Sequence, residues 1–213
     1  MKGFARSVVL LCGLISLPVL AEAPPPPDQV IEQKFWGQLY ANGGVTFYCQ
    51  KPFKRKSVLI TESHIYSDSW MRDALGCTTP RLCQKESEEY RIMAADLHNL
   101  QPAEARFELE RRGARFEELG PEIERDKCGF KRSFGIMDPP NRIRGDIARA
   151  ILYMHERYNL PLVGDLPQLQ RWNRLDPPDE AEKARNEMIR ELQGNTNPFI
   201  DNPARADMVT SEY

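Results

Sequence analysis

The segment TESHIYSDSW, residues 61–70, is the part of this 213-residue chain around which we expect the rest to fold. Its histidine, His64, lies at the edge of an apolar run, and the same arrangement recurs in DLHNLQP, residues 96–102. In both segments the histidine stands beside carboxylate, hydroxyl or amide side chains that can bind a metal ion or a phosphate group. The two segments therefore mark the predicted functional centre of the chain.

Length and composition indicate one globular domain that is exported. Apolar residues make up 41% of the chain and charged residues 28%, as is usual for soluble proteins. The N-terminus has the form of a secretory signal, because Lys2 and Arg6 precede an apolar run at residues 7–20 and Ala21 offers a cleavage site. That run is shorter than the roughly 18 to 20 residues of a membrane span. We therefore expect residues 1–21 to be removed and the protein to be periplasmic or secreted, without a membrane anchor.

Four cysteines remain after removal of that signal: Cys49, Cys77, Cys83 and Cys128. An even number in an exported chain indicates two disulfides. Cys77 and Cys83 are near enough in sequence to close a small loop, which leaves Cys49 with Cys128, although the sequence alone permits three pairings. A zinc site made by all four thiolates is the alternative, and the absence of a CxxC pair disfavours it.

The charge of the chain is weaker evidence for its function than the two histidine segments are. After residue 21 there are 27 Lys and Arg residues against 31 Asp and Glu residues, and this balance does not itself indicate a nucleic-acid-binding protein. Clusters matter more, because a groove can be basic on an acidic protein. Basic side chains gather at residues 51–56, 125–132 and 142–149. Each cluster alone is also consistent with an ordinary solvated surface.

Hydrophobic periodicity and breaker residues predict an α+β fold, with many helices around a small β-core. We expect a proline-rich spacer at residues 22–28, a single domain at residues 29–203 and a disordered tail at residues 204–213. The predicted helices cover residues 29–39, 79–95, 102–120, 165–175 and 177–192, with a longer one that Asp138 caps and that presents Ile143, Ile147, Ile151, Met154 and Tyr158 on one face. The predicted strands cover residues 45–48, 57–60 and 130–137.

Four motifs in a fixed order resemble the endonuclease I family of secreted and periplasmic non-specific nucleases. They are HIYSDSW at residues 64–70, MAADLHNLQPA at 93–103, RIRGDIARA at 142–150 and QGNTNPF at 193–199. The second is the most specific, and the likeness covers most of the chain after the signal. The resemblance implies a mostly helical domain whose small β-core carries the ββα-metal motif of the His-Me finger nucleases.

The resemblance also implies roles for residues near His64, which falls on the general base. In the family a glutamate directly before this histidine binds the metal ion, but here Ser63 holds that position and Glu62 comes one residue earlier. The second ligand is normally an asparagine, and Glu108 stands in its place. Arg111 falls on an arginine that faces the scissile phosphate. Because side chains alternate along a strand, Glu62 is expected to point away from the Ser63 face unless a bulge re-aims it.

Further residues receive supporting roles from the same comparison. Asp96, His98 and Asn99 are expected to brace the metal site, and Arg115 and Arg144 to contact phosphate groups. A purely structural interpretation competes with each role, since a lone histidine is more often structural and a helix such as the one predicted at 102–120 carries many solvated charges.

The implied function is an exported, metal-dependent endonuclease that hydrolyses phosphodiester bonds of DNA, with RNA as a second candidate substrate. His64 would activate water, and a divalent ion, with Mg²⁺ the expected one, would bind mainly through Glu108. The protein is expected to act as a monomer. One alternative is a catalytically impaired relative that binds nucleic acid without cleaving it, and another is an envelope interaction protein with no role on nucleic acid.

Overall fold

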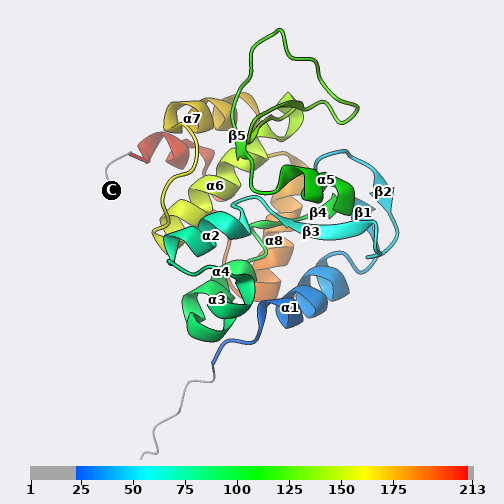
Figure 1. The fold of residues 1–213 in the computed structure, drawn as a ribbon, viewed down its shortest axis with the longest axis vertical. Helices are drawn as coiled ribbons and strands as arrows, with labels where there is room; N and C mark the ends of the chain where they lie inside the picture. Colours follow the sequence, from blue (N-terminus) through cyan, green and yellow to red (C-terminus); the bar gives the residue numbers. More distant parts are fainter. Residues whose placement is uncertain (1–22, 211–213) are drawn as a thin grey trace, which may run out of the picture.

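In the described part of the protein, helices surround three small sheets (Figure 1). This computed structural model describes residues 23–210, so the predicted signal at residues 1–21 lies outside the described part. About half of the chain is helical, which confirms the predicted α+β class in a single domain. No helix within residues 23–210 combines the length and the apolarity needed to cross a bilayer.

A β-β-α unit lies in the middle of the molecule. Strand β3 (Ile60–His64) pairs antiparallel with β4 (Leu100–Glu104), and His64 lies opposite Leu100 in the register. Helix α5 (Ala105–Arg111) follows β4 without a loop and packs on both strands. The predicted ββα motif is therefore present, with its histidine at the end of the first strand.

Two predictions around this unit are wrong. The helix predicted at residues 102–120 contains only α5, because Pro102 and Ala103 pair with β3 and the backbone turns left-handed at Arg112 and Gly113. The strand predicted at residues 57–60 is displaced along the chain, since regular pairing begins only at Ile60. In both cases the pairing of strands far apart in sequence overrides local helix or strand propensity.

Three short helices connect β3 to β4: α2 (Asp68–Ala74), α3 (Pro80–Glu86) and α4 (Glu88–Ala94). The helix predicted at residues 79–95 starts as expected at Thr79, whose hydroxyl accepts a hydrogen bond from the Leu82 amide. It is nevertheless divided at Ser87. There the backbone becomes extended and the hydroxyl caps a new helix by accepting a hydrogen bond from the Tyr90 amide, at 3.0 Å. A serine can end one helix and begin another in this way because its hydroxyl replaces a lost backbone acceptor.

The C-terminal half supplies the long helices that cover the core. Helix α6 (Arg144–Tyr158) follows a short 3-10 turn, η2 (Asn141–Ile143), and its predicted apolar face is buried except at the half-buried Tyr158. Asp138 does not cap it, because this residue lies in a strand and binds the Arg144 side chain. Helices α7 (Leu166–Leu175) and α8 (Glu180–Gln193) match their predictions closely.

The remaining elements are short. At the N-terminal side lie α1 (Pro27–Val30), the π-helix η1 (Ile31–Leu39), β1 (Gly44–Val45) and β2 (Pro52–Phe53). The third sheet has β5 (Arg115–Phe116), β6 (Lys131–Ser133) and β7 (Ile136–Asp138), and the chain ends with α9 (Pro198–Asp201) and η3 (Pro203–Met208).

These short elements correct three further predictions. The strand predicted at residues 45–48 stops at Val45, where the chain enters a turn. The strand predicted at 130–137 is a hairpin, because Gly135 takes a positive φ of 68° and reverses the chain between β6 and β7. Within the tail expected to be disordered, η3 covers residues up to Met208 and buries Ala206 against the body.

Both disulfides join the pairs that the sequence favoured, Cys77 with Cys83 and Cys49 with Cys128. The zinc alternative is therefore wrong, since all four sulfurs are used in covalent bonds. The two bonds close loops of very different length, because Cys77 and Cys83 are 6 residues apart in sequence and Cys49 and Cys128 are 79 apart.

Arg149 on α6 is buried at the junction with α7 and α8, where carboxylates outnumber it. Its Nε donates to Glu182 at 2.8 Å, and its Nη2 lies 3.7 Å from an Asp146 carboxylate oxygen. Asp176 completes the group by accepting the Gly145 amide at 2.9 Å. Burial raises the pKa of Asp146 to about 8, and the Glu182 charge adds to the rise. One of these carboxylates therefore carries a proton near neutral pH.

Removal of each disulfide by paired Cys→Ala substitution should destabilise the fold unequally. In the chain-entropy description, loss of Cys49–Cys128 costs about 4 kcal/mol and loss of Cys77–Cys83 about 2 kcal/mol, because the first bond closes a far longer loop. Denaturant unfolding of the two double variants measures the difference, and mass mapping without reductant checks the linkages. A larger loss for the short loop would contradict this ordering.

The Asp146 group should make stability depend on pH. Its pKa is about 8 in the folded chain and takes the ordinary value of 3.8 on unfolding, so the folded state binds the extra proton between these limits. The free energy of unfolding therefore falls as pH rises through this window, by up to about 1.4 kcal/mol per pH unit. Asp146→Asn should reduce this slope and gain on wild type from pH 5 to pH 8 in denaturant titrations, while Glu182 and Asp176, whose pKa values are also raised, keep part of it. A difference between the two proteins that does not change with pH would disprove the assignment.

Candidate active site

The candidate site lies where the end of β3 meets α5. The positions that the resemblance assigns to the two metal ligands face each other across this junction, since the Ser63 hydroxyl donates a hydrogen bond to the Glu108 carboxylate. His64 follows directly at the strand end. The β-β-α unit thus brings the side chains of Ser63 and Glu108 into contact although they are 45 positions apart, and His64 is the next residue of the strand.

The imidazole of His64 is held in one tautomer by the backbone of α4. Its Nε2 lies 2.8 Å from the carbonyl oxygen of Ala94. A carbonyl oxygen can only accept a hydrogen bond, so Nε2 carries the proton and Nδ1 of the neutral ring keeps its lone pair. A half-buried histidine oriented in this way can take a proton at Nδ1, as a general base must.

A chain of hydroxyl groups supports the Glu108 carboxylate. Ser63 gives its single proton to Glu108, so the Tyr48 hydroxyl, 2.9 Å from Ser63 Oγ, must be the donor in its own bond to Ser63. Burial raises the pKa of Tyr48 to about 12, and the Glu108 charge also raises it. Tyr48 therefore remains a donor at all ordinary pH values, and the carboxylate is fixed from the strand side.

Arg111 lies behind the site and not in front of it. Its side chain is 0% exposed, and its two terminal nitrogens donate to the carbonyl oxygens of His64, at 2.6 Å, and Ile65, at 2.7 Å. Nη1 also lies 3.5 Å from Glu108. The structure thus gives Arg111 a role in holding the end of β3, and it does not present this guanidinium to a phosphate group as the resemblance implied.

Glu62 belongs to the opposite face of β3, as strand alternation predicted. Its carboxylate accepts a hydrogen bond of 2.9 Å from the Trp36 indole nitrogen, on the side of η1. No bulge re-aims it, since the β3–β4 register is continuous from Ile60 to His64. Glu62 and Glu108 consequently do not form one ligand set.

The DLHNL segment, residues 96–100, supports the site through hydrogen bonds. Asn99 holds both backbone groups of Tyr66. Its side-chain oxygen accepts a hydrogen bond from the Tyr66 amide at 2.7 Å, and its side-chain nitrogen donates one to the Tyr66 carbonyl at 3.0 Å. Asp96 accepts hydrogen bonds from the hydroxyls of Tyr153, at 2.7 Å, and Tyr158, at 2.6 Å, both on α6. These contacts tie the end of β3 to the long helices.

His98 is buried in the same brace, and its chemistry is structural. One ring nitrogen, Nε2, lies 3.1 Å from the Asn195 carbonyl, and burial lowers the pKa of the imidazole. A lowered pKa keeps the ring neutral, and its burial, with 3% of the residue exposed, gives it no access to a substrate. His98 therefore connects the DLHNL segment to the closing QGNTNPF motif.

The two remaining predicted phosphate contacts differ in accessibility. Arg115 on β5 is 56% exposed and forms an ion pair with Glu117, at 3.2 Å. Arg144 donates to Asp138 at 2.6 Å and to Glu118 at 3.1 Å, and its guanidinium also lies over the Trp172 ring. Arg115 is thus available to a ligand, whereas Arg144 already serves to anchor the start of α6.

Glu108 is the residue of this site that suits a divalent ion. Its side chain is 29% exposed, and Mg²⁺ typically binds through one or two carboxylates while keeping several waters and taking substrate phosphate oxygens. Ser63 does not suit a cation, because it is only 1% exposed and already bonds to Tyr48, Glu108 and Arg111. The donor set therefore fits an ion held by a single protein ligand.

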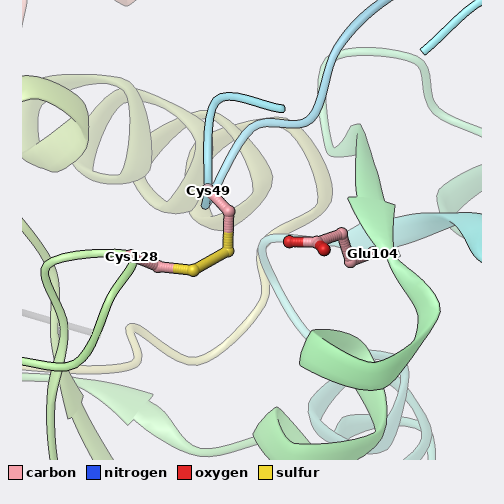
Figure 2. Close-up of side chains that lie close together, drawn as sticks. All are labelled: Cys49, Glu104 and Cys128. Atoms are coloured by element: carbon pink, nitrogen blue, oxygen red, sulfur yellow. A yellow bond between two sulfur atoms is a disulfide. The ribbon is translucent and has the colours of Figure 1, made fainter. Parts of the chain in front are cut away.

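A second grouping of metal-ligating residue types is not a metal site. Figure 2 shows Cys49, Cys128 and Glu104, which are the only group of three or more such side chains in residues 23–210 whose ligand atoms lie within 4.8 Å of one another. The two sulfurs form a disulfide, so neither offers a thiolate. Glu104 forms an ion pair with Lys51 at 2.6 Å.

Sequence reasoning missed two residues that shape the site. Tyr48 was expected only as part of a strand, and Trp36 only as part of a helix. Their signal was available in their chemistry, because buried tyrosine and tryptophan side chains need a partner for the hydroxyl or the indole N–H. The partners themselves, Ser63 and Glu62, could not be identified without the fold.

Comparison with known proteins agrees with this geometry. The sequence model of the family Endonuclease I matches residues 38–204. An extracellular deoxyribonuclease from Aeromonas hydrophila is 39% identical over 121 residues, covering 54% of this chain and 53% of the relative. An extracellular ribonuclease from Bacillus amyloliquefaciens is 33% identical over 133 residues, covering 54% of this chain and 46% of the relative.

The chain spans about half the length of those two relatives. A longer match is a second extracellular deoxyribonuclease from Aeromonas hydrophila, 30% identical over 221 residues, which covers 90% of this chain and 94% of the relative. The family match reaches across most of the chain and includes the whole β-β-α unit. This protein therefore belongs to the endonuclease I family.

Proposed function

We propose that this protein is an exported nuclease that hydrolyses phosphodiester bonds of DNA, with RNA as a further substrate. The observation that carries the proposal is the geometry of His64, a half-buried imidazole whose Nε2–H is fixed by the Ala94 carbonyl and whose Nδ1 is left to accept a proton. Relatives named as deoxyribonucleases and as a ribonuclease support both substrate classes.

His64 and Arg111 have different tasks in hydrolysis. His64 takes a proton from the attacking water at Nδ1, and the resulting imidazolium keeps its hydrogen bond to Ala94. Arg111 fixes the carbonyls of His64 and Ile65, so the imidazole approaches the substrate from a rigid strand end. Binding of the diester falls to exposed cations outside this centre, since Arg111 is buried.

The endonuclease I family is metal-dependent in general. In this chain Glu108 would hold the divalent ion, Mg²⁺ being the expected one, and Ser63 would orient Glu108 through its hydrogen bond. Such an ion supplies Lewis-acid stabilisation of the charge that develops on the phosphate and the leaving oxygen.

Three observations support the proposed export. The first 21 residues have the form of a secretory signal, and several relatives are named as extracellular or periplasmic enzymes. Two disulfides are consistent with an oxidising compartment. We infer a periplasmic or secreted monomer whose signal is cleaved after Ala21.

A second candidate function is binding of nucleic acid without cleavage. The observation that favours it is the direct hydrogen bond between Ser63 and Glu108, which closes the strand-side ligand position. With one protein ligand in place of two, metal affinity falls, and a sufficiently large fall leaves a protein that only binds.

Substitution of His64 by alanine should lower plasmid nicking by roughly 10² to 10⁴ while leaving DNA binding almost unchanged, because the base contributes to the transition state more than to binding. Nicking assays and anisotropy on the same preparations measure the two effects, and added imidazole should restore part of the rate. An unchanged rate in the purified His64→Ala protein would eliminate this assignment.

Metal titration of wild type, Ser63→Glu, Glu108→Ala and the double variant Ser63→Glu with Glu108→Asn tests the single-ligand site. Wild type should need a higher Mg²⁺ concentration than either protein carrying Glu at position 63, and Glu108→Ala should lose metal-dependent nicking. Calorimetric Mg²⁺ binding gives the same order without relying on activity. If wild type is inactive at every metal concentration and Ser63→Glu gains nothing, hydrolysis is excluded and the binding function replaces it.

A further inference from the structure

Phe134 is the most exposed large hydrophobic side chain in the described part of the protein, at 102%. It is also the only aromatic in that exposed group, since the others are Val, Leu, Ile and Met side chains. Aliphatic residues scattered over a surface are ordinary. A fully exposed phenylalanine offers water two faces of an aromatic ring, and that surface suits stacking against another flat π-system.

The ring is presented by a rigid support. Phe134 and Gly135 form the reversal of the β6–β7 hairpin, and Gly135 takes the positive φ of 68° that this tight turn needs. The strand before the turn is anchored by Arg132, whose guanidinium lies 4.7 Å from the centre of the Phe107 ring on α5. The strand after it buries Met137 in the core. A rigid support lowers the entropy lost when the ring binds a ligand.

A cationic residue lies beside the tip. The Arg115 amide donates to the Gly135 carbonyl at 2.8 Å, which places Arg115 directly beside the turn. Its side chain is largely exposed, and its surface pair with Glu117 is of the kind worth about 0 to 1 kcal/mol. A phosphate group can therefore replace Glu117 at little cost.

A hollow of about 300 Å³ lies between the turn of the β6–β7 hairpin and the end of α5. Its lining includes Arg112 and Gly113 after the end of α5, Arg132 on β6 and Gly135 in the turn, with a single acid, Glu110. Cations thus outnumber acids in the hollow. The same helix end carries Arg111, which holds the backbone of His64. The aromatic tip and the candidate catalytic strand are therefore joined through one short helix.

We propose that Phe134 is a base-stacking platform for a nucleic-acid strand with unpaired bases, with Arg112 and Arg115 contacting the flanking phosphates. The inference rests on the proposed function for its choice of ligand, and it adds a preference for single-stranded segments over intact duplex. Stacking on an aromatic face tolerates any base, so the platform suits recognition without sequence preference.

Binding of a fluorescein-labelled 15-nucleotide oligothymidylate, measured by anisotropy in a His64→Ala background, tests the platform. Phe134→Ala should weaken binding roughly 5- to 150-fold, as loss of one stacked base does, whereas Phe134→Trp should retain affinity. Leu175→Ala removes another exposed apolar side chain, on α7, and should have no effect. A 15-base-pair duplex should respond less to Phe134→Ala than the oligothymidylate does.

The salt dependence of binding supplies a second readout. Arg115→Gln should reduce the slope of log affinity against log salt by about 0.7, the value for one phosphate contact on a single strand. An unchanged slope would show that Arg115 does not contact a phosphate group of the bound strand.

The outcomes separate the platform from the hydrolytic function. If wild type nicks DNA but Phe134→Ala binds the oligothymidylate as well as Leu175→Ala does, the platform is overturned and the proposed function stands. If wild type does not nick DNA yet binding depends on Phe134, the platform stands without hydrolysis. Absence of binding by every protein overturns the platform as well.

Discussion

The structure of the centre depends on one buried cation. Arg111 is removed from water, and a guanidinium in that position must find partners for its charge and its N–H groups. The charge and the terminal N–H groups find them in the carbonyls of His64 and Ile65, in Glu108 and in the flanking rings of Trp70 and Phe116. The buried Nε has no hydrogen-bond partner among the described residues. The end of β3, the start of the following segment and the last turn of α5 are consequently held by a single side chain. The geometry of His64 follows from this arrangement.

The negative charge beside this cation comes from the helix and not from the strand. The strand residue before His64 is the neutral Ser63, and the carboxylate near Arg111 belongs to Glu108 on α5, 3.5 Å from Nη1. Without that carboxylate the buried cation would be poorly compensated, which is a costly state in a buried site. Glu108 and Arg111 are therefore physically coupled.

Sequence reasoning succeeded where the signal is local or chemical. The start of α7 and the end of α8 were predicted closely, because the Asp165 cap and the left-handed Gly194 each satisfy groups within their own turn. The face of Glu62 followed from strand alternation alone. The long helix predicted after Pro102 failed because β3 recruits that segment as a strand, and the burial of Arg111 was hidden because its partners are backbone carbonyls 46 and 47 positions away. Patterns of side chains cannot reveal contacts that the backbone makes.

The disulfide between Cys49 and Cys128 restrains a segment next to the candidate site, and its formation depends on the redox environment. Cys49 directly follows Tyr48, the residue whose hydroxyl begins the chain of hydrogen bonds to Glu108. Thiols remain reduced in the cytosol and pair in oxidising compartments. In a chain exported as proposed, the covalent restraint on the turn that carries Tyr48 would therefore be added only after the polypeptide has left reducing surroundings. A chain still inside the cell would hold this turn by non-covalent contacts alone.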